Sequence, residues 1–291
     1  MKAVTWRPVM VTFGPGTIGL LDAGQLAVRE AARDVVASGF QPLDALLPAG
    51  GVRRGSLIEW LAGGADAAGG AAGAGTATGT GAATLACAVA CRLARAAAGS
   101  ARALVLVDRT GWFHPPAVLP WLGSGQGDVR LVVARPAHDD DEIWTIDQAL
   151  RCPGVAAVLA WPREGVAAGL GGAVASRRRP TRSWAVAMRR WQLSARAGGA
   201  VGLFVRPLAA VGEPSWAEAR IAVAPLPGGS LLERRLRLER VGGEWIGGAE
   251  GARAVEVAID LARGCAAVPR GAQAAGSRRA FAERSPACRA S

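Results

Sequence analysis

A glycine-rich loop at residues 63–81 is the part of the sequence best placed to do chemistry. The apolar run at residues 56–61 before it predicts a short strand. Residues 82–98 after it predict a helix, because Leu85, Val89 and Leu93 recur at helical spacing. In this order of strand, loop and helix, backbone N–H groups and the helix N-terminus can hold the phosphates of a nucleotide. The stretch therefore predicts the layout of a phosphate-binding loop.

This loop lacks the groups that phosphoryl transfer needs. In the best register of the motif Gly-x-x-x-x-Gly-Lys-Ser/Thr, Ala82 stands at the lysine position, Ala83 at the metal-binding hydroxyl and Thr76 at the first glycine. Lys2 is the only lysine of the chain. Because the lysine and the metal contact neutralise charge during transfer, we expect no ATP hydrolysis, no cofactor and no enzymatic activity. The candidate residues of this degenerate phosphate site are Gly79, Gly81, Ala82, Ala83, Thr84 and Asp108.

Asp108 follows the apolar run at residues 103–107, which predicts a buried parallel strand with a polar group at its C-terminal end. Its carboxylate could be a lone magnesium contact. It could equally accept hydrogen bonds at the sheet edge, and we favour this interpretation because it needs no ligand.

Two further clusters have a structural and a chemical interpretation. Four acids at residues 139–142 favour a helix start, where they complement the helix dipole, over a metal site. Cys87 and Cys91 lie four residues apart on one predicted helix face, which favours a buried pair over a metal or redox site. His114 and His138 are the only histidines, so a zinc cluster is not expected.

The order of elements predicts an α/β fold. Apolar strands at residues 56–61, 103–108, 131–135, 154–161 and 201–206 alternate with helices, which indicates a mainly parallel central sheet flanked by helices. Runs at residues 220–224, 236–241 and 255–259 predict antiparallel strands at the C-terminal edge. We expect an N-terminal segment at residues 1–38 with one helix at 22–37, a core at 39–265 and a basic, disordered tail at 266–291.

The net charge of +11 comes almost entirely from arginine and favours polyanionic partners, nucleic acid first and anionic membrane second. The alternative is a solvated arginine-rich surface. Seven arginines and no acid lie between residues 177 and 196, so this region is either a DNA contact, a solvated loop or a surface for an acidic protein. The candidate DNA-binding residues are Arg177, Arg178, Arg179, Arg182, Arg189 and Arg190.

No apolar run of 18 residues occurs, so we expect a cytoplasmic protein without a membrane partner.

These pieces, taken together, resemble the RecA-like core of P-loop NTPase type. Leu43 and Asp44 precede a Gly-Gly turn, the strand of residues 57–59 and the loop, and the strand ending at Asp108 resembles the next family strand. More specifically, the chain resembles the ImuA family of RecA-like accessory proteins of bacterial damage-induced mutagenesis. Four strings carry this resemblance: GVRRGSLIEW at 51–60, VDRTGWFHPPA at 107–117, IWTIDQALR at 143–151 and EPSWAEAR at 213–220.

The resemblance implies a non-catalytic adaptor in translesion DNA synthesis. Its implied partners are an ImuB-like Y-family polymerase homologue, an error-prone C-family DNA polymerase, single-stranded DNA, and either RecA or further copies of the chain. The family's catalytic glutamate would be Thr110 here, and the acid ending a later strand would be near Trp161. The arginine run at 177–182 falls at the first recombinase DNA loop and residues 208–215 at the second, with Trp184 or Trp191 as base-stacking candidates. The alternatives are a DNA-dependent ATPase of the recombinase family and a cell-division inhibitor.

Overall fold

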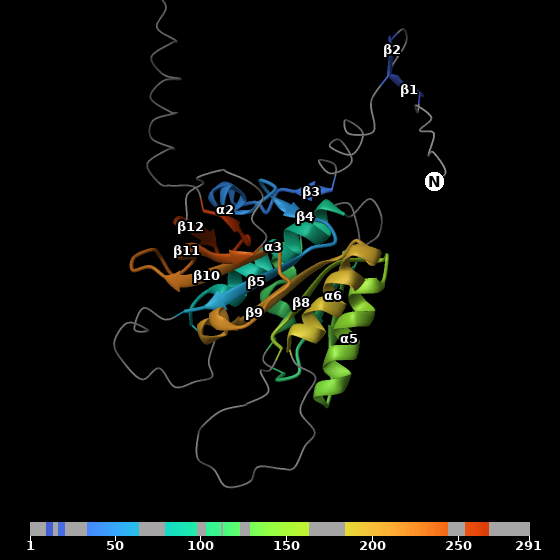
Figure 1. The fold of residues 1–291 in the computed structure, drawn as a ribbon. Coiled ribbons are helices and arrows are strands. Elements are labelled where there is room, and N and C mark those ends of the chain that lie inside the picture. The colour runs from blue at the N-terminus through green and yellow to red at the C-terminus, as the bar shows by residue number, and fades with distance from the viewer. Residues whose placement is uncertain are drawn as a thin grey trace, which may run out of the picture.

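A nine-stranded sheet forms the centre of the described chain (Figure 1). The computed structural model describes residues 10–13, 17–20, 34–63, 79–97, 103–111, 113–122, 129–162, 184–243 and 254–267. The strands of the sheet are β5 (Leu57–Ala62), β6 (Ala103–Val107), β7 (Arg130–Ala134), β8 (Val155–Ala160), β9 (Val201–Pro207), β10 (Ala219–Pro225), β11 (Glu233–Gly243), β12 (Ala254–Asp260) and β13 (Cys265–Ala266).

The sheet has a parallel part and an antiparallel part. Its strand order is β13-β12-β11-β10-β5-β9-β8-β6-β7, and every pairing from β10 to β7 is parallel. The pairings of β10 with β11, β11 with β12 and β12 with β13 are antiparallel. The predicted mainly parallel sheet with antiparallel strands at the C-terminal edge is therefore confirmed. Strand β5, which precedes the glycine-rich loop, is the middle strand and lies between β9 and β10.

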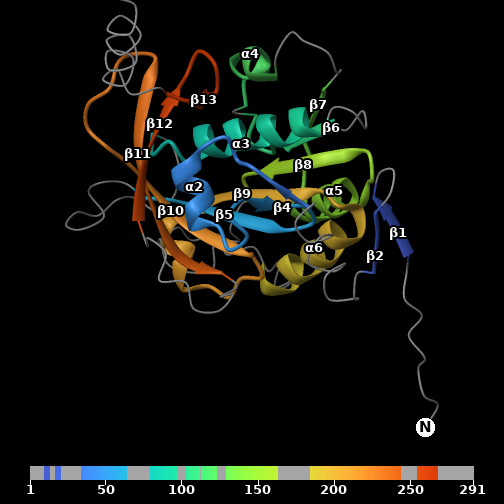
Figure 2. The same cartoon turned by 90° about the horizontal axis from the view of Figure 1, so that it is seen from above.

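Helices cover both faces of this sheet (Figure 2). On one face lie α2 (Gln41–Leu46), α3 (Ala82–Ala96) and α4 (Leu119–Leu122), the last preceded by the 3-10 helix η2 (Pro115–Ala117). On the other face lie α5 (Asp139–Arg151) and α6 (Trp184–Gly198). The 3-10 helix η3 (Leu208–Gly212) follows β9. The predicted flanking helices are thus present, and α3 begins at the residue that the sequence predicts.

Strand β5 divides the core into two hydrophobic clusters, because successive side chains of a strand point to opposite faces. Ile58 and Trp60 pack with the α3 face, whereas Leu57 packs with the α5 and α6 face. Every residue of β5 is buried, which explains why the strand is apolar throughout except for Glu59. The central strand therefore fixes where the helices on both faces lie.

The N-terminal segment departs from prediction where it is described. Residues 35–36, which the sequence placed at the end of a helix, form β3 (Val35–Val36), paired antiparallel with β4 (Val52–Arg53). Two adjacent β-branched valines favour this extended conformation. The remainder of that predicted helix, residues 22–33, lies outside the described residues. A short hairpin of β1 (Met10–Phe13) and β2 (Thr17–Leu20) was not predicted, and β13 takes in the first residue of the predicted tail, of which residues 268–291 are not described.

Candidate functional site at the start of helix α3

A pocket of about 390 Å³ lies where the sequence predicts the phosphate site. Its wall includes five of the six candidate residues, namely Gly79, Gly81, Ala83, Thr84 and Asp108. The pocket lies at the carboxyl ends of β6 and β8, where Asp108 and Trp161 line it, and ligands bind at this edge in sheets of this kind. Ala82 itself is fully buried and does not line the pocket.

The start of α3 requires a glycine. Gly81 precedes the helix with a φ of 86°, a left-handed conformation that favours glycine. A Cβ atom at this position would collide with the side chain of Leu236 from β11. The hydroxyl of Thr80 accepts a hydrogen bond from the Ala82 N–H at 3.2 Å, so one of the first helical N–H groups is already satisfied within the chain.

Arg234 brings a cation to this pocket from the far end of the sequence. It comes from β11, lines the pocket and donates a hydrogen bond through Nη2 to the carbonyl oxygen of Gly79. Its guanidinium therefore lies beside the helix start whose motif lacks a lysine. Arg234 could not be predicted from the motif, because it belongs to a strand some 150 residues later in the chain. Only the antiparallel extension of the sheet by β11 brings it here.

Asp108 is buried and acts as a hydrogen-bond acceptor. Its Oδ1 accepts from the hydroxyl of Thr110 at 2.9 Å, and its Oδ2 accepts from the Phe113 N–H at 2.8 Å. These bonds support the interpretation of Asp108 as a structural acceptor that ends β6. Thr110, at the position of the family's catalytic glutamate, has a hydroxyl and cannot serve as a carboxylate base there.

Aromatic and apolar side chains make up much of the remaining wall. Trp161 and Phe113 face each other with ring centroids 6.4 Å apart, and Trp121 and Val118 lie on the wall nearby. Trp121 also donates its indole N–H to the carbonyl oxygen of Leu261, which ties the pocket to the turn after β12. The wall thus offers apolar contact more than charge.

The two helix cysteines are buried, as predicted. Cys87 lines the pocket and Cys91 lies one turn further along α3. Burial raises the pKa of the Cys87 thiol well above its ordinary value and that of Cys91 to about 12, with Arg95 partly offsetting the second shift. Both thiols are therefore protonated at neutral pH and are poor nucleophiles.

The acids at the start of α5 bond within the chain. Arg109, which follows Asp108, forms an ion pair with Asp139 and lies 3.8 Å from Glu142. In the part of the chain that the structure describes, no group of three or more His, Cys, Asp or Glu side chains could hold a metal ion.

Of the candidate DNA-binding arginines, the structure describes Arg189 and Arg190, and neither lines the pocket. Arg177, Arg178, Arg179 and Arg182 fall outside the described residues. Arg190 donates to buried Asp147 at 2.6 Å and joins α6 to α5. Arg189 stacks over the ring of Trp216, 4.3 Å from its centroid.

Of the two tryptophans considered for base stacking, Trp191 is excluded by burial. Its side chain has 0% exposure, and its indole N–H donates to the carbonyl oxygen of Ile143 at 3.2 Å. The side chain of Trp184 lies outside the described residues. Trp216 is partly exposed and lies beside Arg189. It was not predicted as a contact residue.

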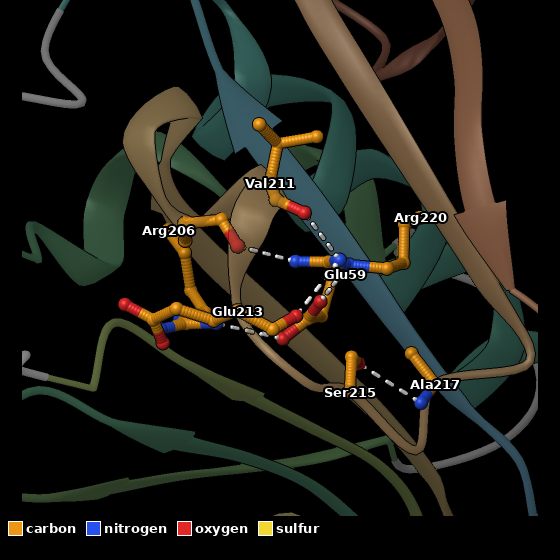
Figure 3. Close-up of polar contacts among 8 residues, drawn as sticks. Glu59, Arg206, Val211, Glu213, Ser215, Ala217 and Arg220 are labelled. Atoms are coloured by element: carbon orange, nitrogen blue, oxygen red, sulfur yellow. Dashed lines mark hydrogen bonds and ion pairs between the residues drawn. The ribbon is translucent and has the colours of Figure 1, made fainter. Parts of the chain in front are cut away.

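A buried ionic network holds the segment that was expected to form the second DNA loop (Figure 3). Glu59 on β5 accepts from Arg206 on β9 at 3.1 Å and from Arg220 on β10 at 2.6 Å. Arg206 also bonds Glu213 at 2.5 Å. Arg220 donates to the carbonyl oxygens of Ala210, Val211 and Glu213, at 2.6, 2.9 and 3.1 Å.

This network attaches residues 208–213 to the sheet. Charge-assisted bonds to backbone carbonyls fix the path of the chain as well as satisfying the buried guanidinium. The sequence does contain a signal for this network. Glu59 is an acid inside a strand that is otherwise apolar, and a buried acid needs a charged or hydrogen-bonding partner.

No protein-family model matches the chain, and no curated protein matches it. The described helices include none with the length and hydropathy of a membrane span.

Proposed function

We propose that the chain is a non-catalytic, RecA-like adaptor in damage-induced translesion DNA synthesis, acting with an ImuB-like protein and an error-prone C-family DNA polymerase. The observation that supports the proposal is a pocket at the start of α3 whose surrounding sequence has the layout of a phosphate loop without its catalytic groups. Alanines replace the lysine and the metal-binding hydroxyl, and Thr110 stands at the position of the base. The four strings that resemble the ImuA family supply the cellular context.

The sheet supports the RecA-like part of the proposal. Strand β5, the loop after it and α3 follow one another as in a phosphate-binding unit, and β5 is the middle strand of the sheet and pairs in parallel with both of its neighbours. Asp108 ends β6 beside this unit, although its carboxylate bonds Thr110 and the Phe113 N–H. Retaining the scaffold while losing the charges is expected of a domain that docks rather than hydrolyses.

Co-expression with the ImuB-like and polymerase proteins encoded nearby tests the proposal. We expect the three proteins to co-purify and the chain to release no phosphate from ATP, with or without single-stranded DNA. Phosphate release at a recombinase-like rate would overturn the non-catalytic assignment. Failure to co-purify in any pairing, with all proteins folded, would overturn the adaptor role.

Arg234 favours a second candidate, a DNA-dependent ATPase with an unusual loop. A guanidinium beside the start of α3 could neutralise phosphate charge in place of the missing lysine. A titration with fluorescent ATP distinguishes the two functions. The ATPase candidate requires binding that Arg234→Ala weakens at least about tenfold and that Arg235→Ala, an exposed neighbour on β11, leaves unchanged. The adaptor proposal expects no saturable binding of ATP to the original chain or to either variant.

A further inference from the structure

Exposed hydrophobic side chains gather on the outer surface of α5 and α6. Trp144 is 59% exposed, Val186 58%, Leu193 52% and Trp216 43%. Five of the nine large hydrophobic side chains exposed in the described residues, these four and Val211, belong to α5, α6 or the segment after β9. A concentration of this kind on one face indicates a protein-binding surface.

These side chains form one continuous face, which we call the outer face. Val186 and Leu193 lie seven residues apart and so share one side of α6, opposite the buried Met188 and Ala195. On α5, Trp144 points away from buried Ile146 and from the sheet. The two helices run side by side along one side of the molecule (Figure 1) and are joined by the bonds of Arg190 and Ser194 to Asp147.

Charges of opposite sign flank the hydrophobic strip. Asp140 and Asp141 are exposed in the first turn of α5. Arg189 and Arg196 are exposed on the side of α6 that faces Trp216, away from α5. From one edge to the other, the outer face is therefore acidic, apolar and basic.

We infer that the outer face binds the same face of a second copy of the chain, forming a two-fold symmetric dimer. A two-fold axis that lies in the contact plane, parallel to the helices, lays α5 of one copy over α6 of the other, running in the same direction. The acidic edge of each copy then meets the basic edge of its partner. Because Gly198 lies against Leu150, the two helices end at the same level, so Asp141 of one copy comes opposite Arg189 of the other. Trp144 packs against Val186 and Leu193 of the second copy. This inference does not depend on the proposed function.

Self-association fits the surface better than a nucleic acid does. Asp140 and Asp141 would repel a phosphate backbone that crossed the face. One face of the Trp216 ring is already covered by Arg189, and the strip between the charged edges is aliphatic and aromatic. Opposite charges on a single face are what an isologous contact requires.

Sedimentation of the full chain over a concentration series up to about 100 µM tests the dimer. We expect a monomer–dimer equilibrium whose dissociation constant rises at least about tenfold in the variant Val186→Asp with Leu193→Asp. The matched control is Leu231→Asp, which changes a 99% exposed leucine in the turn before β11 and should leave the equilibrium unchanged. Circular dichroism checks that each variant is folded.

A charge swap tests the register of the two copies. Asp141→Arg and Arg189→Glu should each weaken the dimer, and the two changes in one chain should restore it. A chain that stays monomeric throughout the series overturns the proposal, as does a dimer that the strip variant leaves intact. A monomer whose affinity for a fluorescent oligo-dT falls with Arg189→Glu would assign the face to nucleic acid and likewise overturn it.

Discussion

Glu59 and Arg220 meet across the neighbouring strands β5 and β10, with Oε2 of Glu59 2.6 Å from Nε of Arg220. Both side chains are buried. Arg220 also holds three carbonyl oxygens of the segment after β9, so a single guanidinium joins the sheet to that segment. The carboxylate of Glu59 is balanced by two arginines rather than one.

Replacing Arg220 should therefore be costly. In Arg220→Met, Glu59 loses one of its two charge partners and three backbone carbonyl oxygens lose their donor. We expect the free energy of unfolding to fall by about 3–5 kcal/mol. Urea denaturation measures the change. Arg235→Met, which removes the exposed ion pair between Arg235 on β11 and Glu256 on β12, is the control and should cost no more than about 1 kcal/mol. Equal stability of the two variants would contradict a central role for the network.

Asp147 should make stability depend on acid pH. Burial alone would raise the pKa of Asp147, but hydrogen bonds from Arg190 and Ser194 and the charges of Arg190 and Arg151 lower it overall. A lowered pKa in the folded state contributes stability that is fully present above the unfolded pKa of about 4 and is lost as the pH falls through the folded value.

The measurement compares the original chain with Asp147→Asn by urea denaturation at several pH values. The stability advantage of Asp147 should be constant near neutral pH and should shrink below about pH 4. An advantage that grows on acidification would mean that the sign of the pKa shift is wrong.

The Asp108 carboxylate should stabilise the folded chain and should not bind Mg²⁺. In Asp108→Asn, one of the two bonds from Thr110 and the Phe113 N–H loses its acceptor, so unfolding should become easier by about 1–3 kcal/mol. Thermal denaturation with and without Mg²⁺ checks this. A melting temperature that Mg²⁺ raises in the original chain but not in the variant would restore the interpretation of Asp108 as a metal contact.

The buried thiols should resist alkylation. With iodoacetamide at about pH 8, exposed Cys152 and Cys265 should react, while Cys87 and Cys91 should stay unmodified until the chain unfolds, because burial raises their pKa values. Mass spectrometry of peptides, before and after addition of urea, gives the extent at each site. Labelling of Cys87 as fast as Cys152 would mean that the pocket wall opens readily.

Patterns that are local in sequence predicted most of the fold. The apolar runs of β5, β6 and β8 and the spacing of α3 indicated elements that the structure contains almost at the expected residues. Residues 35–36 were assigned to the helix predicted at residues 22–37, but their pairing with β4 decides their conformation. Strand pairing is non-local, so periodicity alone cannot detect it.

The candidate site was only half predictable for the same reason. Gly79, Gly81, Thr84 and Asp108 come from consecutive elements, so the order of elements along the chain was enough to predict that they lie together. Arg234 and Trp121 reach the pocket through the register of β11 and the contact of α4 with the turn after β12. Neither relationship can be derived from spacing along the chain.

The position of β5 has a consequence for how the chain is made. Both strands that pair with β5 follow it by well over one hundred residues, since β9 begins at Val201 and β10 at Ala219. At about 5–20 residues per second, a ribosome needs roughly 7–30 s to pass from the end of β5 to the end of β9. Throughout that interval a strand that is buried along its whole length in the folded protein has two open edges, so the nascent chain should depend on chaperones until its last third emerges.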